Sequence, residues 1–333
     1  MTTQKRIIIL FTCFIFAVDC LLYLQLLDFS IFKNQVIRYK NNEIEITRNT
    51  KKQTFSRHRQ KQTSKKTCIY LHGSGVYAEH TVVTENFADY WGNIKQFTSH
   101  QCDDHYFVIT DTYERGWDDI DLQQTYCNAT TFGHNPQKII ITHSMGGLIL
   151  GASFHNKTCD RNRDDLIWIA SQTPLKGSIA SNNLVDICRL EQPESYSHWF
   201  YRAMGEQFGY CNSTTNKPAT SYQTMHTNYK NIQQVGKYSF SSINKMLCGT
   251  SAFGLYSKYS MALEFLEWVS GFKYINDGMV SIESCMNDSE KLCQNDETKN
   301  YYCPALNHAD GTCRNGNSNW YSLYPCTFFN TKE

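Results

Sequence analysis

The sequence predicts an α/β fold in which a mostly parallel sheet is flanked by helices. Short apolar runs of four or five residues alternate with helical stretches, a pattern typical of strands that are buried on both faces. The 333 residues are 41% apolar and 19% charged, which supplies a sizeable core and excludes a disordered chain. The 32 Lys and Arg residues nearly balance the 31 Asp and Glu residues, so we expect no nucleic-acid partner.

The folded domain is expected over residues 67–327, where this alternation is found. Its predicted strands are 68–71, 106–110, 138–142 and 166–170, with a short further strand at Tyr274-Ile275. Its predicted helices are 87–97, 148–152 and 261–268. The polar segment 179–249 interrupts the pattern, and we interpret it as a cap or lid insertion.

Residues 1–30 form a predicted transmembrane or signal helix. Lys5 and Arg6 precede the apolar stretch 7–27, which is long enough to cross a bilayer and longer than the apolar region of most cleaved signal peptides. No good cleavage site follows, so we favour an uncleaved signal anchor over a signal peptide. Asp19 is the main objection to a membrane-spanning helix, and a buried hydrophobic hairpin is the remaining alternative.

Residues 31–66 are predicted to form a basic, disordered stalk. From position 38 to position 66, ten Lys or Arg residues stand against two acidic residues, and apolar residues are scarce. Such a run is usually only solvated. Contact with anionic lipid headgroups or with a protein partner is the alternative.

Twelve cysteines lie between Cys68 and Cys326, beyond the N-terminal stretch. Their even number and the lack of C-x-x-C pairs favour disulfides over a zinc site, without fixing how they pair. We therefore expect a lumenal or extracellular domain, which would be secreted if the N-terminal segment is cleaved. Four glycosylation sequons agree with this compartment, although about four are expected by chance. They are at Asn128, Asn156, Asn212 and Asn287.

The most informative motif follows the predicted strand 138–142. The segment Thr142-His143-Ser144-Met145-Gly146-Gly147 places a serine between that strand and a helix rich in small residues. Strand, sharp turn and helix are the order of a nucleophile elbow, in which small residues two positions before and after the serine avoid clashes. Gly146 fills the second small position, whereas Thr142 stands where glycine is commoner.

With this motif, and with a preceding strand that ends in His72-Gly73, residues 67–327 resemble an α/β-hydrolase of the lipase and esterase type. The resemblance implies the α/β-hydrolase fold and a catalytic serine, acid and histidine in that order along the chain. The serine needs an imidazole to accept its proton, and the imidazole needs a carboxylate to fix its tautomer.

These three roles are expected at Ser144, Asp277 and His308. Asp277 lies in a glycine turn that resembles the lipase acid site, although Asn-Asp-Gly is also an ordinary turn sequence. His308 is the only histidine after Asp277. Asp310 is the alternative acid, because it is close to His308 in the sequence.

The resemblance also implies two backbone amides that stabilise the negative oxygen formed during acyl transfer. We expect one from Met145, the residue after the serine. The other is expected from Ser74, with Gly75 or Val76 as alternatives, because the glycines beside it let the backbone turn its amides inward.

Three further features near these positions carry no catalytic role in this interpretation. His72 and His143 flank turns, and we interpret them as structural residues outside the pocket. The segment Thr173-Pro174-Leu175-Lys176-Gly177-Ser178 resembles the Thr-Pro-His-x-Gly-Ser segment of many lipases, but Leu175 replaces the histidine, so we infer no substrate from it. Aromatic residues of the predicted cap either line an acyl pocket or belong to the core. They are Trp199, Phe200, Tyr201, Phe208 and Tyr210.

Together these features predict a serine hydrolase that cleaves carboxylic esters through an acyl-enzyme, without a metal or organic cofactor. A lipid-like ester is the expected substrate, by analogy with lipases and from placement at a membrane through the N-terminal segment. Two alternatives stay open: an acyltransferase that uses the same three residues, and a non-catalytic adhesion or binding domain. Thr142 and Leu175 mildly favour the non-catalytic alternative, and the three intact site residues oppose it.

Overall fold

The computed structural model describes residues 37–39, 66–160, 165–189, 210–212 and 217–331. The predicted N-terminal helix, most of the predicted stalk and four of the cap aromatics (Trp199, Phe200, Tyr201 and Phe208) lie outside the described residues. Among the residues that are described, no helix is both long and apolar enough to span a bilayer.

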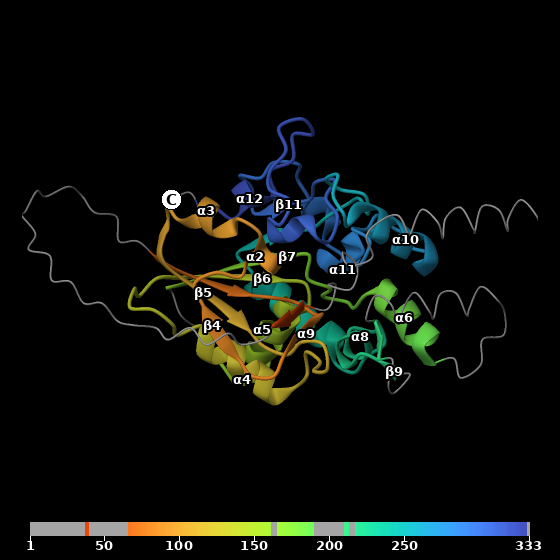
Figure 1. Cartoon of the computed structure of the whole chain (residues 1–333), viewed down its shortest axis with the longest axis horizontal. Helices are drawn as coiled ribbons and strands as arrows, with labels where there is room; N and C mark the ends of the chain where they lie inside the picture. Colours follow the sequence, from red (N-terminus) through yellow and green to blue (C-terminus); the bar gives the residue numbers. More distant parts are fainter. Residues whose placement is uncertain (1–36, 40–65, 161–164, 190–209, 213–216, 332–333) are drawn as a thin grey trace, which may run out of the picture.

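A seven-stranded sheet forms the centre of the molecule (Figure 1). All neighbouring strands are parallel except β4 and β5, which are antiparallel. In spatial order the strands are β11 (Tyr301–Tyr302), β10 (Lys245–Leu247), β7 (Leu166–Ser171), β6 (Lys138–His143), β2 (Lys66–Leu71), β5 (Cys102–Ile109) and β4 (Val82–Thr84). Two further two-stranded sheets pair β1 (Ile37–Tyr39) with β3 (Val76–Ala78) and β8 (Cys211–Asn212) with β9 (Lys217–Pro218).

Helices cover both faces of this sheet, which confirms the predicted α/β class. Figure 1 shows α4, α5 and α9 below the sheet and α3, α10 and α12 above it. On the lower face α5 packs against both α4 and α9. The helices are α2 (Ala88–Trp91), α3 (Ile94–Thr98), α4 (Ile120–Ala129), α5 (Met145–His155), α6 (Ile179–Arg189), α8 (Thr220–Thr224), α9 (Ile232–Ser242), α10 (Ser260–Ser270), α11 (Ile282–Cys285) and α12 (Pro325–Phe328), with short 3-10 turns at η2 (Glu290–Leu292) and η3 (Asp310–Thr312).

Strand residues alternate between two hydrophobic clusters on opposite faces of the sheet. In β6, Ile140 belongs to one cluster, whereas Ile139 and Ile141 belong to the other. The neighbouring pair Trp168 and Ile169 in β7 divides in the same way. Because both faces are buried, these strands read in the sequence as continuous apolar runs.

The four longer predicted strands are confirmed as β2, β5, β6 and β7, but the strand predicted at Tyr274-Ile275 is wrong. Both side chains are largely exposed, at 52% and 60%, and only an isolated bridge between Asn276 and Ser281 follows them. Two apolar residues in a turn region therefore do not specify a strand here. Beyond β7 the sheet continues through β10 to β11, the strand at its edge.

The carboxyl-terminal part of the predicted cap insertion, 179–249, belongs to the main fold. Helix α9 packs against α5, and β10 is hydrogen-bonded to β7 in the central sheet. Strand β10 was not predicted, because three residues are too few to show a period. Its first residue, Lys245, is of a type usually found at the surface. Lys245 is nevertheless buried, and its Nζ donates to the carbonyl oxygens of Phe328 (2.6 Å) and Asn330 (3.1 Å).

The helix predicted over 87–97 is divided into α2 and α3 by Gly92. This glycine has a φ of +52°, which a side chain rarely adopts, and a Cβ there would overlap the backbone of Cys313 and Arg314. The chain therefore changes direction at the point where it meets the segment that follows η3.

Six disulfides join the twelve cysteines beyond the N-terminal stretch, as their even number predicted. Disulfides of this number are characteristic of an oxidising compartment outside the cytosol. The pairs are Cys68–Cys102, Cys127–Cys159, Cys188–Cys211, Cys248–Cys285, Cys293–Cys303 and Cys313–Cys326.

We predict that Trp168→Ala lowers the free energy of unfolding by about 3–5 kcal/mol, because the indole is fully buried and its removal leaves a cavity. Trp320→Ala is the matched control, since its side chain is 89% exposed, and it should change this free energy by less than about 0.5 kcal/mol. Urea denaturation followed by circular dichroism measures both. Equal effects of the two substitutions would contradict the assigned packing.

Candidate active site

Ser144 lies in the sharp turn between β6 and α5, at the carboxyl end of the sheet. Its φ of 53° and ψ of −131° place it in a backbone conformation that non-glycine residues rarely adopt. Gly146 is the second residue of α5, and a Cβ there would overlap the carbonyl oxygens of Leu71 and His72 at the end of β2. The glycine is needed because the elbow and the end of β2 approach so closely.

Thr142, which departs from the usual glycine of such turns, has a specific place. Its side chain is buried, and its Oγ1 accepts a hydrogen bond of 3.0 Å from the Trp168 indole nitrogen in the neighbouring strand. The threonine therefore gives the buried Trp168 N–H group an acceptor, at a position where the nucleophile elbow itself requires only a small residue.

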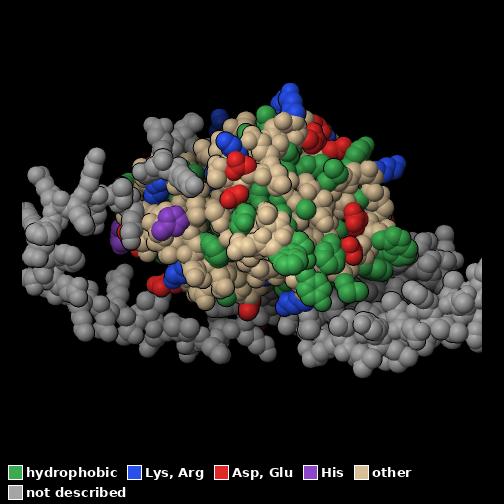
Figure 2. Space-filling model, turned by 90° about the horizontal axis from the view of Figure 1, so that it is seen from above, with side chains coloured by type: hydrophobic (Ala, Val, Ile, Leu, Met, Phe, Trp, Pro, Cys, Tyr) green, Lys and Arg blue, Asp and Glu red, His purple; other side chains and the backbone are tan. Residues whose placement is uncertain are grey.

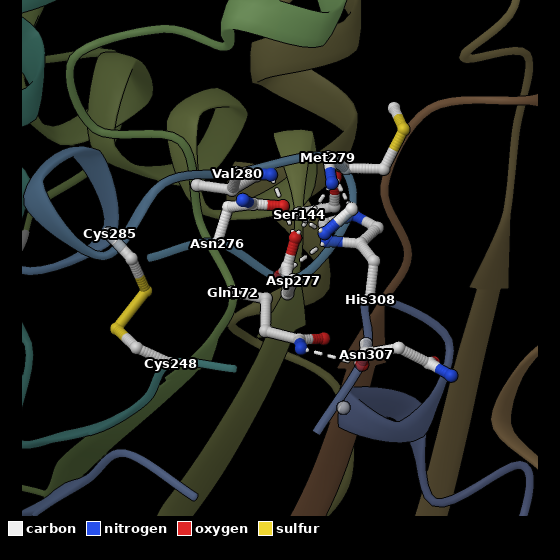
Figure 3. Close-up of polar contacts among 12 residues, drawn as sticks. Ser144, Gln172, Cys248, Asn276, Asp277, Met279, Val280, Cys285, Asn307 and His308 are labelled. Carbon is white, nitrogen blue, oxygen red and sulfur yellow. Dashed lines mark hydrogen bonds and ion pairs between the residues drawn. A yellow bond between two sulfur atoms is a disulfide. The ribbon is translucent and has the colours of Figure 1, made fainter. Parts of the chain in front are cut away.

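Three side chains that are far apart in the sequence meet at this turn (Figure 3). His308 Nε2 lies 2.9 Å from Ser144 Oγ, and His308 Nδ1 lies 2.9 Å from Asp277 Oδ2. A carboxylate only accepts hydrogen bonds, so Nδ1 carries the ring proton and Nε2 is free to accept the hydroxyl proton of Ser144. This is the protonation state in which an imidazole acts as a base toward a serine.

Asp277 is held by its own turn. Its Oδ1 accepts hydrogen bonds from the backbone amides of Met279 (3.0 Å) and Val280 (2.7 Å), and its side chain is 1% exposed. The turn continues into α11, where Cys285 is joined by a disulfide to Cys248 at the end of β10 (Figure 3). The carboxylate is thus fixed relative to the sheet by a covalent bond as well as by hydrogen bonds.

The loop that carries His308 is fixed on both sides of the imidazole. The His308 amide donates to the Asp277 carbonyl oxygen at 2.8 Å, which ties the two loops together through the backbone. Asn307 donates through Nδ2 to the carbonyl oxygen of Phe253 (2.8 Å), and its Oδ1 accepts from the amides of Ala309 and Asp310. The imidazole itself is 12% exposed, so it is both positioned and accessible.

Asp310, the alternative acid, is directed elsewhere. Its Oδ2 accepts from the amides of Leu255 (2.8 Å) and Asn307 (2.9 Å), and its Oδ1 accepts from Asn315 Nδ2 (2.7 Å). Burial raises the pKa of Asp310 to about 6. Asp310 therefore stabilises the His308 loop, and Asp277 is the carboxylate that contacts the imidazole.

The two histidines interpreted as structural differ in their positions. His72 is buried, accepts the Thr110 amide at Nε2 (3.1 Å), and has its pKa lowered by burial to about 4. His143 lines the cleft around Ser144, which corrects the expectation that it lies outside the pocket. Burial, with smaller contributions from the neighbouring His308 and Arg314, lowers the pKa of His143 well below its usual value, so its ring is neutral.

His143 is part of a hydrogen-bond network that joins distant segments of the chain. His143 Nε2 lies 3.0 Å from the His308 carbonyl oxygen, which only accepts, so this nitrogen carries the proton. His143 Nδ1 then accepts from the Tyr90 hydroxyl at 2.7 Å, and Tyr90 in turn accepts from the Gly73 amide. On the other side, Gln172 Nε2 donates to the Asn307 carbonyl oxygen at 2.8 Å. No sequence pattern links these residues, because each contact joins distant segments.

Over residues 73–76, just after β2, the one amide without a protein acceptor within the described part of the chain is that of Ser74. The Gly73 amide donates to Tyr90, and the amides of Gly75 and Val76 donate to Thr112 at 3.3 and 3.4 Å. Ser74 lines the same cleft as Ser144, and Met145 begins α5, where the first amides of a helix have no partner within it.

A cleft with a free volume of about 100 Å³ opens over Ser144. Its walls carry tyrosines and the apolar side chains of Leu263 and Met279. Of the five aromatic residues named for the predicted cap, Tyr210 is the one within the described residues, and it lines this cleft. No group of three or more His, Cys, Asp and Glu side chains is placed to hold a metal ion anywhere in the described ranges.

The segment Thr173–Ser178, whose Leu175 departs from the lipase pattern, supports the acid turn. Leu175 is fully buried in the core rather than in the cleft. Ser178 Oγ donates to the carbonyl oxygen of Met279 at 2.5 Å, and Ser284 Oγ donates to the carbonyl oxygen of Gly177 at 2.6 Å. The segment therefore acts on the site through the Asp277 turn.

No family model matches the chain, and no curated protein matches its sequence. Its structure is similar to that of the lipase BlEst2 of Bacillus licheniformis in its mature form, with 14% identity and a TM-score of 0.49, covering 77% of this chain and 89% of that chain. A metagenomic carboxyl esterase is 9% identical with a TM-score of 0.45, over 80% of this chain and 74% of that one. Lipase 1 from Pelosinus fermentans is 12% identical with a TM-score of 0.35, over 80% and 97%. At TM-scores below 0.5, the chemistry has to come from the side chains of this chain.

We predict a pH-dependent difference in stability between the wild type and Asp310→Asn. Because the pKa of Asp310 is raised from 3.8 to about 6, the native state holds this proton more tightly than the unfolded chain does. The carboxyl group's contribution to the free energy of unfolding is therefore complete below about pH 4, falls as the pH rises to 6, and is level above. The wild type should lose about 3 kcal/mol relative to Asp310→Asn between pH 4 and pH 7.

Urea denaturation at several pH values measures this difference. Asp186→Asn, at an exposed position, is the matched control and should show a difference that does not vary with pH. The assignment is contradicted if the Asp310→Asn difference is equally flat.

Proposed function

We propose that this chain is a serine hydrolase of the α/β-hydrolase type that cleaves carboxylic esters, with Ser144 as nucleophile, His308 as general base and Asp277 as the acid that orients it. The observation that carries the proposal is the unbroken hydrogen-bond path from Ser144 Oγ through the imidazole to the Asp277 carboxylate. A structural serine would need only a local partner, whereas this path joins three loops at the carboxyl end of the sheet.

In the proposed reaction, Ser144 Oγ attacks the ester carbonyl carbon while His308 Nε2 takes the hydroxyl proton. Asp277 stabilises the resulting imidazolium through Nδ1. The imidazolium then gives the proton to the leaving alcohol, and an acyl-enzyme on Ser144 remains. Water attacks this ester with His308 again as base, which releases the carboxylic acid and restores the serine.

The negative oxygen of each tetrahedral intermediate would be stabilised by the backbone amides of Met145 and Ser74. The amides next to Ser74 already donate hydrogen bonds to Tyr90 and Thr112, which leaves the Ser74 amide for the substrate oxygen. Met145 supports the second position because it begins α5. Fixed donors of this kind stabilise charge as it develops, because they need no reorganisation during the reaction.

A lipid-like ester is the substrate class that we propose. Leu263 and Met279 give the cleft apolar walls, and α10, which carries Leu263, exposes Met261 and Trp268 at 64% and 67%. On the face of the molecule seen in Figure 2, hydrophobic side chains gather toward the side on which α10 lies in Figure 1. Exposed apolar side chains next to a cleft favour a substrate that is itself partly apolar.

We predict that Ser144→Ala and His308→Ala abolish covalent labelling by a fluorophosphonate probe and lower kcat for a 4-nitrophenyl ester by at least about 10³-fold. Asp277→Asn should lower kcat by about 10⁴-fold, because the amide no longer fixes the reactive tautomer of His308. Gel fluorescence and initial rates measure these effects. Ser99→Ala and His134→Ala, both at exposed positions, are the matched controls and should label as the wild type does. Equal labelling of all five variants would reject the proposal.

A further inference from the structure

The cleft that contains Ser144 also contains one guanidinium group, that of Arg314. Arg314 lines the cleft together with Ser144 and His308, and it follows His308 by six residues along the same segment. Nothing in the proposed hydrolysis of an ester uses this side chain. A positive charge in the wall of a substrate cleft therefore requires its own explanation.

Arg314 is held in place by Tyr90 and Tyr259, and these contacts leave some of its N–H donors without a partner among the described residues. Its Nε and Nη2 donate to the Tyr90 carbonyl oxygen at 3.1 and 2.8 Å. The guanidinium carbon also lies 5.0 Å from the centre of the Tyr90 ring and 4.9 Å from that of Tyr259, within the range of cation–π attraction. A guanidinium has five N–H donors, so three remain beyond the two given to Tyr90.

No described carboxylate neutralises this charge. Among the described residues, none of the ion pairs within 4 Å includes Arg314, and no Asp or Glu lines the cleft. The oxygens of Asp277 are already engaged by the His308 imidazole and by two backbone amides. A cleft whose fixed charge has one sign concentrates ligands of the opposite sign.

We propose that Arg314 binds an anionic group of the substrate, a carboxylate or a phosphate, and so makes the cleft selective for esters that carry a negative charge. The inference rests on the proposed ester hydrolysis and narrows its substrate class. Arginine suits this role because its planar fork of donors matches the oxygens of both groups. The tyrosine contacts preorganise the fork, which reduces the entropy lost when the anion binds.

A purely structural role for Arg314 makes a different prediction. If the side chain only held the Tyr90 carbonyl group in place, its loss would disturb Ser144 and His308 equally for every ester. Selective binding instead changes the ratio of kcat/KM between a charged ester and its neutral analogue. The ratio therefore separates the two roles, whatever happens to the absolute rate.

The experiment measures kcat/KM for two matched substrate pairs at low ionic strength. One pair, mono-4-nitrophenyl adipate and 4-nitrophenyl methyl adipate, places the charge in the acyl group. The other pair, 1-butyryl-glycerol 3-phosphate and 1-butyryl-glycerol, places it in the alcohol. The wild type should prefer the anionic member of at least one pair, and that pair identifies the side of the ester that faces Arg314.

In Arg314→Met this ratio should fall by about 10- to 100-fold, the loss expected for a charged hydrogen bond. Arg314→Lys should retain an intermediate ratio, because it keeps the charge without the fork. Lys258→Met is the matched control: its Nζ lies 5.1 Å from the Tyr259 ring, but its exposed side chain does not line the cleft, so the ratio should not change.

The inference is overturned if the wild type shows no preference for either anionic ester, a result that needs no variant to fold. It is also overturned if Arg314→Met leaves the ratio unchanged. Failure of the underlying ester hydrolysis is distinguishable, because the neutral esters would then not be turned over by the wild type in a way that depends on Ser144.

Discussion

The arrangement of the site depends on the contact between Asp277 and His308, which involves both their side chains and their backbones. The side chains meet at 2.9 Å, and the His308 amide also donates to the Asp277 carbonyl oxygen at 2.8 Å. A buried carboxylate is costly unless its oxygens are satisfied, and here two turn amides and the imidazole satisfy them. The sheet holds this pair in register with Ser144, since Gln172, directly after β7, donates to the carbonyl oxygen of Asn307. Loops that would otherwise move are therefore fixed to the same edge of the sheet.

The parts of the fold that the sequence predicts are those governed by local rules. Continuous apolar runs such as 138–142 predict buried parallel strands, and the crowding around Ser144 demands small residues at fixed spacing. The short strands β10 and β11, the last two at one end of the sheet, escape prediction because three or two residues carry no period. Tyr274-Ile275 misleads for the same reason, since an apolar pair says nothing about burial.

Within the site, the elbow motif, the glycine turn around Asp277 and the order of serine, acid and histidine along the chain together selected the three residues that meet. The residues that support them were not predictable from the sequence. Tyr90 and Gln172 both contact His143, and they are 53 and 29 residues away from it along the chain. Arg314 was likewise missed, since its role depends on two rings that only the folded chain brings beside it. Thr142 shows the converse: a departure from a motif has a physical reason once its partner, Trp168, is known.

In the proposed site, Ser144 is the nucleophile that bonds to the substrate, and the amides of Met145 and Ser74 stabilise the negative oxygen. A crystal structure of the protein after reaction with a phosphonate ester tests this most directly, because the bound group mimics the tetrahedral intermediate. We expect phosphorus to be bonded to Ser144 Oγ, with the phosphoryl oxygen within about 3 Å of the amides of Met145 and Ser74. Phosphorus bonded to any other side chain, or a phosphoryl oxygen directed away from both amides, would contradict it.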